Sequence, residues 1–209
     1  MRAETKSRFR RLLEIATHLD AQALTWHGLR YDIGNPHLVS AFFESAVWAG
    51  RQAQEAGLML CLETVSWCYL RTPEQVADVR RANLPVGFTF DTFQAGESET
   101  DPVALIQAMN ADRCLRTVHI ADYAPGAPRH LLPGQGILDW HAILGTLQRG
   151  GYTGPLILEP AHIQAPDVLV QARTFIEFAW SRLQDGEGRY TNKIGFDKPE
   201  HLCYSRENK

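Results

Sequence analysis

The sequence lacks several features that would place it in particular classes of protein. It has no apolar run of the roughly 20 residues that a membrane-spanning helix needs. Its first residues follow a charged helical pattern and do not resemble a signal sequence. It also lacks a strong excess of one charge, since the net charge is -3, which argues against nucleic-acid or membrane binding through bulk charge. We therefore expect neither a membrane nor a nucleic-acid partner.

Cysteine pairs and linkers are also missing. The four cysteines include no Cys-x-x-Cys pair, and Cys61 and Cys114 lie in or beside apolar, strand-like segments. This usage is typical of reduced thiols, so we expect a cytoplasmic protein. No internal repeat and no low-complexity segment divides the 209 residues. The length fits one domain that is large enough to bury a core.

Helical and strand-like segments alternate along the chain. Apolar residues at helical spacing predict helices over Lys6–Leu19, Pro36–Ala56, Pro73–Ala82, Pro102–Met109, Asp139–Arg149 and Pro166–Leu183. Short apolar runs predict strands over Ala23–His27, Leu58–Glu63, Val86–Asp91, Leu115–Asp122 and Pro155–Glu159. This order is typical of an α/β fold with a parallel sheet built from βαβ units. The five strands fall short of the eight in a closed (β/α)8 TIM barrel.

Side chains that commonly bind metals lie at the ends of four successive predicted strands. Glu63, Asp91 and Glu159 each end a strand, and His119 lies just before the end of another. The carboxyl ends of the parallel strands in a barrel converge on one face, so these residues are expected to meet in space. A single acid at a strand end is more often a helix cap or a turn former. The joint pattern of three carboxylates and an imidazole favours one divalent metal ion: Mn²⁺, Mg²⁺, Co²⁺ or Zn²⁺.

Several motifs surround these four residues. They are CLETVSW around Glu63, GFTFDTFQAG around Asp91, TVHIADY around His119, LLPGQGILDW at Leu131–Trp140, and GGYTGPLILEP leading to Glu159. With these motifs the chain resembles the xylose-isomerase-like TIM-barrel superfamily. Its members include ketose 3-epimerases, hydroxypyruvate isomerases, inosose dehydratases and type IV apurinic endonucleases. The resemblance implies that Glu63, Asp91, His119 and Glu159 are the metal ligands on the last four barrel strands.

The resemblance also accounts for the low number of strands. Ala23–His27 corresponds to the fourth strand of the family, so the first three βα units are expected to be absent. Residues 1–184 would then form an incomplete barrel of about five parallel strands with flanking helices, followed by a polar tail at 185–209. Either Met1 is an internal start, or another copy supplies the missing surface in a homo-oligomer. Two strand edges, at Ala23–His27 and Leu156–Glu159, are expected to be open.

The implied function is that of a metal-dependent isomerase or epimerase with a small keto or aldo sugar as substrate. In such chemistry a proton moves next to the sugar carbonyl, and the metal stabilises the enediolate that forms. The resemblance to ketose 3-epimerases implies that Glu63 and Glu159 are the catalytic bases. Two alternatives stay open. One is a lyase similar to inosose dehydratases, and the other is a truncated metal-binding remnant without activity.

Further candidates lie near the same strand ends. Four side chains are candidates for contact with substrate: His27, Trp67, Gln94 and Arg129. Each also has an ordinary interpretation as a packing or solvated loop residue. Gln94 stands where many relatives have a histidine, and glutamine is a poor metal ligand, which disfavours the endonucleases with their multinuclear zinc. Asp122 is expected to orient the His119 imidazole from outside the ligand shell.

Overall fold

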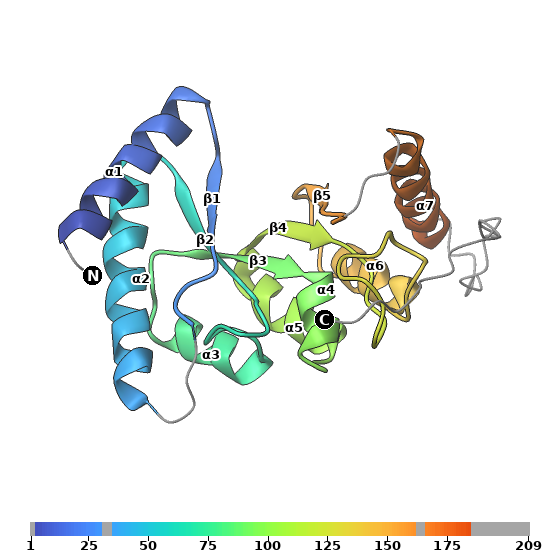
Figure 1. The fold of residues 1–209 in the computed structure, drawn as a ribbon, viewed down its shortest axis with the longest axis horizontal. Coiled ribbons are helices and arrows are strands. Elements are labelled where there is room, and N and C mark those ends of the chain that lie inside the picture. Colours follow the sequence, from blue (N-terminus) through green and yellow to red (C-terminus); the bar gives the residue numbers. More distant parts are fainter. Residues whose placement is uncertain (1–2, 31–34, 162–165, 185–209) are drawn as a thin grey trace, which may run out of the picture.

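Five parallel strands form one open sheet in the computed structural model, which describes residues 3–30, 35–161 and 166–184 (Figure 1). The strands lie side by side in the order of the chain: β1 (Ala23–Trp26), β2 (Met59–Glu63), β3 (Gly87–Asp91), β4 (Leu115–Ile120) and β5 (Leu156–Leu158). All pairings are parallel. The prediction of an incomplete barrel with about five parallel strands is therefore confirmed.

Helices connect the strands. They are α1 (Ala3–His18), α2 (Pro36–Glu55), α3 (Pro73–Arg81), α4 (Thr92–Glu97), α5 (Pro102–Asn110), α6 (Trp140–Arg149) and α7 (Pro166–Gln184), with a 3-10 turn at Ala111–Arg113. Side-chain caps explain where several of them begin, since Asn35, Thr72 and Asp101 each accept a backbone N–H of the first turn. Every predicted helix is present with slightly different ends, whereas the short helix α4 was not predicted.

The two faces of the strands have different surroundings. Leu60, Phe88 and Val118 belong to the main apolar core together with helical residues such as Phe42 and Ile106. Since strand side chains alternate between faces, the residues between them point to the inner side of the curved sheet. There the hydroxyls of three strands form a hydrogen-bonded row: Thr25 to Thr89 at 3.2 Å and Thr89 to Thr117 at 2.6 Å. Asp91 and His119 follow this row two residues later, on the same face.

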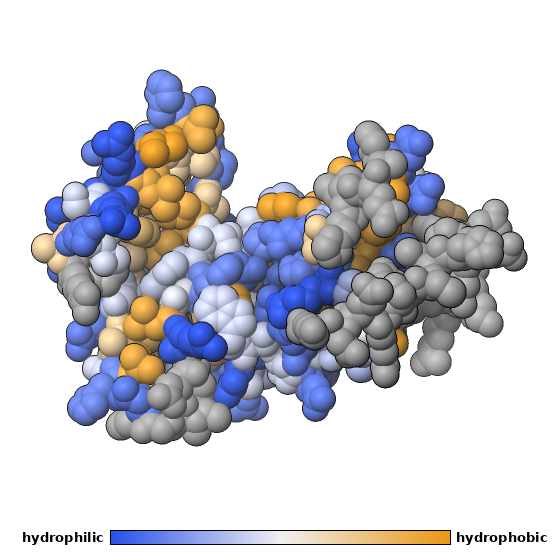
Figure 2. Space-filling view, in the orientation of Figure 1, coloured by the Kyte–Doolittle hydropathy of each residue, from blue (hydrophilic) through white to orange (hydrophobic). Residues whose placement is uncertain are grey.

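Both edges of the sheet are open within the described ranges. β1 pairs only with β2, and β5 pairs only with β4. Apolar side chains are exposed close to both edges: Leu12, Ile15 and Leu19 in and after α1, Ile157 in β5, and Val170 and Phe178 in α7. The hydrophobic colouring over α1 and β1 is visible in Figure 2. The two edges expected from the sequence are thus confirmed.

No helix in the described ranges combines the length and apolar character needed to cross a bilayer. The polar tail that the sequence analysis placed at 185–209 lies outside the described residues.

Candidate metal centre

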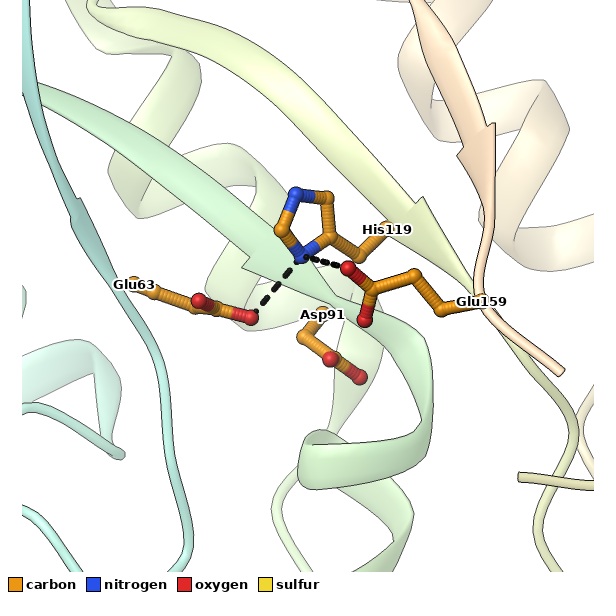
Figure 3. Close-up of side chains that lie close together, drawn as sticks. All are labelled: Glu63, Asp91, His119 and Glu159. Carbon is orange, nitrogen blue, oxygen red and sulfur yellow. Dashed lines mark hydrogen bonds and ion pairs between the residues drawn. The ribbon is translucent and has the colours of Figure 1, made fainter. Parts of the chain in front are cut away.

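Glu63, Asp91, His119 and Glu159 meet at the carboxyl ends of β2, β3, β4 and β5 (Figure 3). One ligand atom from each residue lies within 4.8 Å of the ligand atoms of the other three. Glu63, Asp91 and His119 are buried, and Glu159 is partly exposed. The structure thus brings together all four residues that the sequence analysis named as metal ligands.

The imidazole of His119 lies between two of the carboxylates. Its Nδ1 atom is 2.9 Å from Oε1 of Glu63 and 3.1 Å from Oε1 of Glu159. Figure 3 shows the two glutamates approaching the histidine from opposite sides, with Asp91 between and below them. Oδ1 of Asp91 accepts the backbone N–H of Gln94 and so caps α4, which begins directly after β3. Asp91 therefore both faces the centre and starts a helix.

The electrostatics of this cluster fit a bound cation. The pKa of the Asp91 carboxyl is raised to about 8, mainly by burial and also by the nearby carboxylates of Glu63 and Glu159. The backbone N–H of Gln94 and the His119 imidazole act in the opposite direction. Burial by itself would lower the pKa of His119, but its hydrogen bond to Glu63 and the surrounding carboxylates raise that pKa overall. Three converging carboxylates accumulate more negative charge than a buried space tolerates without protons or a cation. A divalent ion with oxygen and imidazole ligands would relieve that charge.

His27 and Trp67 lie beside the Glu63 end of the centre. Nε2 of His27 is 2.9 Å from Oε2 of Glu63, the oxygen that does not contact His119. The His27 ring meets the Trp67 ring edge to face, with 5.8 Å between the ring centroids. Both side chains are about half exposed. Of the four candidates for substrate contact, these two are exposed to solvent beside Glu63, one of the four candidate metal ligands.

Gln94 and Arg129 are engaged with the protein itself. Oε1 of Gln94 accepts the backbone N–H of Ser66 at 2.9 Å, so this side chain braces the loop after β2. The Arg129 guanidinium pairs with Glu97, with 2.7 Å between Nη1 and Oε1. Glu97 was not singled out in the sequence, because no local motif links it to an arginine 32 positions away.

Asp122 does not orient His119, which corrects the expectation from the sequence. Its fully buried carboxylate accepts hydrogen bonds from four other donors: the backbone N–H groups of Tyr123, Gly134 and Leu138 and the indole N–H of Trp140. The side chain turns toward the loop between β4 and α6 because that loop supplies the donors. Gly136 leaves room for it, since a Cβ atom there would lie 2.3 Å from Oδ1 of Asp122. Asp122 therefore anchors the loop that contains the Pro-Gly-x-Gly segment.

Comparisons with known proteins agree with this fold. A family model described as xylose isomerase-like TIM barrel matches residues 1–178. A solved D-tagatose 3-epimerase-like protein superposes with a TM-score of 0.74 at 18% identity, over 86% of this chain and 69% of that chain. An L-ribulose 3-epimerase gives 0.69 at 18% identity, over 86% and 68% of the two chains. No curated protein sequence gives a significant match.

A third solved structure contains a metal ion. It is described as a xylose isomerase-like TIM barrel protein from Mycobacterium smegmatis in complex with magnesium. It superposes with a TM-score of 0.66 at 18% identity, over 85% of this chain and 67% of that chain. At such identities, the similarity to solved structures shows that the fold is shared.

Proposed function

Since the chain belongs to the xylose isomerase-like TIM-barrel family, we propose that it is a divalent-metal-dependent sugar isomerase or epimerase. The substrate would be a small keto or aldo sugar, and the reaction a proton transfer next to its carbonyl. The observation that carries this proposal is the convergence of one ligand atom each from Glu63, Asp91, His119 and Glu159 within 4.8 Å. The names of the solved relatives, a D-tagatose 3-epimerase-like protein and an L-ribulose 3-epimerase, support a sugar substrate.

The donor set supports a cation that accepts oxygen ligands. Three carboxylates and one imidazole suit Mg²⁺ and Mn²⁺ as well as Co²⁺ and Zn²⁺, and the relative in complex with magnesium is consistent with this set. When bound, such an ion supplies electrostatic stabilisation of the negative charge that develops on the sugar oxygens. Glu63, Asp91, His119 and Glu159 would hold it.

The two glutamates are the best candidates for moving the proton. Glu63 ends β2, Glu159 directly follows β5, and the two reach the centre from opposite sides (Figure 3). A carboxylate on each face of a sugar carbon allows one residue to remove the proton and the other to return it, which is the requirement for inverting a carbon centre. Glu159 is partly exposed, so its carboxylate is accessible to a substrate. Trp67, also partly exposed, would supply an apolar wall beside the sugar.

Two measurements on the purified chain test the proposal. The first is metal content after loading with Mn²⁺, compared between the wild type and Glu159→Gln. The second is exchange of a carbon-bound hydrogen of D-tagatose or L-ribulose for deuterium in D2O, with no change in the mass of the carbon skeleton. We expect bound metal and exchange in the wild type and a large loss of both in Glu159→Gln. Glu177→Gln on α7, which removes a charge from the exposed pair with Arg173, is the matched control.

Three outcomes would contradict the proposal in different ways. Equal metal content in the wild type and Glu159→Gln would show that Glu159 does not hold the ion and would contradict the four-residue site. Stoichiometric metal without exchange on any ketose would identify a metal-binding protein without this activity. A product that is lighter than the substrate by one water molecule would identify a lyase.

A further inference from the structure

Glu97 connects three segments that follow the ligand-bearing strands. It is the last residue of α4, which begins directly after Asp91. Its Oε2 atom accepts the hydroxyl of Ser66, in the loop after β2, at 2.5 Å. The same carboxylate pairs with Arg129, in the loop after β4. Oε2 accepts a hydrogen bond from Nη2 at 3.2 Å, and Oε1 forms an ion pair with Nη1 at 2.7 Å. Both oxygens of Glu97 are therefore engaged.

Arg129 is held firmly in this pair. Its guanidinium lies over the ring of Phe93, with 4.9 Å between Cζ and the ring centroid. Exposed ion pairs usually contribute little, because both side chains are mobile and solvated. Here the Arg129 side chain is 55% exposed but Glu97 is only 25% exposed, both carboxylate oxygens contact the guanidinium, and the guanidinium lies over the buried ring of Phe93. These are the features that make an arginine–carboxylate pair persistent.

The pair is connected to the segment that carries Glu159 through the residue next to Arg129. His130, the residue after Arg129, donates from Nδ1 to the backbone carbonyl of Glu159 at 3.1 Å. The ring of His130 also stacks on Phe93, with 4.3 Å between the centroids. A second arginine, Arg71 in the segment after β2, donates to the backbone carbonyl of Ser66. Two arginines on the carboxyl-end face are thus directed to acceptors within the protein.

A phosphorylated sugar needs charged donors for its phosphate group, and arginine is well suited because its planar fork matches phosphate oxygens. When a guanidinium is paired with a carboxylate, its charge is offset and its fork is directed at that carboxylate, so it attracts a phosphate less strongly than a guanidinium without such a partner does. We propose that Glu97 makes the centre selective for uncharged sugars over sugar phosphates by occupying Arg129. This inference rests on the proposed function for its substrate, whereas the occupation of Arg129 can be tested separately.

The first experiment uses inorganic phosphate as the probe and needs no catalytic activity. Phosphate binding is measured by calorimetry for the wild type, Glu97→Gln and the double variant Glu97→Gln/Arg129→Gln. We expect binding to Glu97→Gln to be at least about tenfold tighter than to the wild type, and the double variant to lose this gain. Glu99→Gln is the matched control, because it removes the same charge from an exposed side chain of the neighbouring turn. Equal affinity in Glu97→Gln and Glu99→Gln would overturn the inference.

The second experiment measures binding of a ketose and of its phosphate ester to the metal-loaded protein, using the fluorescence of Trp67 and the other tryptophans. We expect the wild type to bind the uncharged ketose at least about tenfold more tightly than its phosphate ester. In Glu97→Gln the difference between the two affinities should be smaller. A wild type that prefers the ester would overturn the inference. If neither sugar binds while Glu97→Gln still gains phosphate affinity, the proposed function fails and the role of Glu97 in occupying Arg129 stands.

Discussion

Oε2 of Glu63 lies 2.9 Å from Nε2 of His27, while Oε1 of the same carboxylate lies 2.9 Å from Nδ1 of His119. Contacts to both oxygens fix the plane of the carboxylate as well as its position. His27 follows β1, a strand that contributes none of the four clustered ligands. The first strand of the sheet therefore takes part in the centre by positioning the glutamate of the second.

Replacing His27 tests this positioning. We expect His27→Ala to weaken Mn²⁺ binding about tenfold, because Glu63 loses the partner that fixes its second oxygen. The thermal unfolding midpoint should change little, since the His27 side chain is 52% exposed. His37→Ala, on the exposed surface of α2, is the control and should bind Mn²⁺ like the wild type. Unchanged affinity in His27→Ala would show that Glu63 is positioned without it.

The pH dependence of stability follows from the raised pKa of Asp91. Burial is the main cause that raises the pKa of this carboxyl to about 8 in the folded, metal-free chain, whereas an unfolded aspartate titrates at about 4. Between these values the folded state binds more protons than the unfolded state, so stability falls as the pH rises. The raised pKa of His119 acts in the same direction, because its favourable protonated form is lost as the pH rises. The metal-free chain should thus unfold at lower temperature at about pH 8.5 than at about pH 5.5.

Bound metal should counteract the loss of stability that the metal-free chain shows as the pH rises. Ions and protons compete for the same carboxylates, so Mn²⁺ affinity should rise with pH over the range in which Asp91 loses its proton. Thermal unfolding with and without Mn²⁺ at several pH values measures both effects. An Asp91→Asn variant should lose the part of the pH dependence that Asp91 contributes. A metal-free wild type that becomes more stable between the same pH values would contradict this account.

Asp122 should be important for stability through its four hydrogen bonds. In Asp122→Asn the amide nitrogen would face N–H donors where an oxygen now accepts them, so we expect a loss of about 3 kcal/mol in the free energy of unfolding. The matched control is Asp139→Asn, because Asp139 caps α6 and asparagine caps helices equally well. Urea unfolding of both variants measures the difference. Equal stability of the two variants would show that the Asp122 network contributes little.

The buried thiols should be unreactive in the native chain. Burial raises the pKa of Cys61 to about 11 and that of Cys68 to about 12, so neither forms appreciable thiolate at about pH 8. Iodoacetamide should therefore label the partly exposed Cys114 before either of them, as measured by peptide mass mapping. Labelling in denaturant, where the thiols should react alike, is the control. Rapid native labelling of Cys61 would indicate that β2 opens.

Much of the fold could be predicted because its signals are local. Each strand is a short apolar run, and prolines and capping residues mark where helices begin, as at Thr72 and Pro73. The candidate centre could also be predicted, because parallel strands bring their carboxyl ends together wherever they lie in the chain. That rule predicts that Glu63, Asp91, His119 and Glu159 lie on one face of the sheet, where the structure has them.

The remaining features depend on contacts between distant residues. The helix α4 was missed because six residues show too little periodicity, although the Asp91–Gln94 spacing is that of a cap. Asp122 was assigned to His119 by closeness in sequence, whereas its donors come from the following loop. No sequence pattern relates Glu97 to Arg129. The ends of parallel strands bring His27 near Glu63, but the contact between their side chains is seen only in the structure.

β5 is only three residues long and lies at the edge of the described sheet, yet Glu159 follows it directly. Edge strands are usually among the first parts of a protein to open, and here such opening would withdraw one ligand from the others. An ion shared by Glu159 and Glu63 would thus tie the outermost strand to the interior of the sheet. Loading of the ion and ordering of the last strand would become a single coupled event, so slower amide exchange in β5 would report occupancy of the centre.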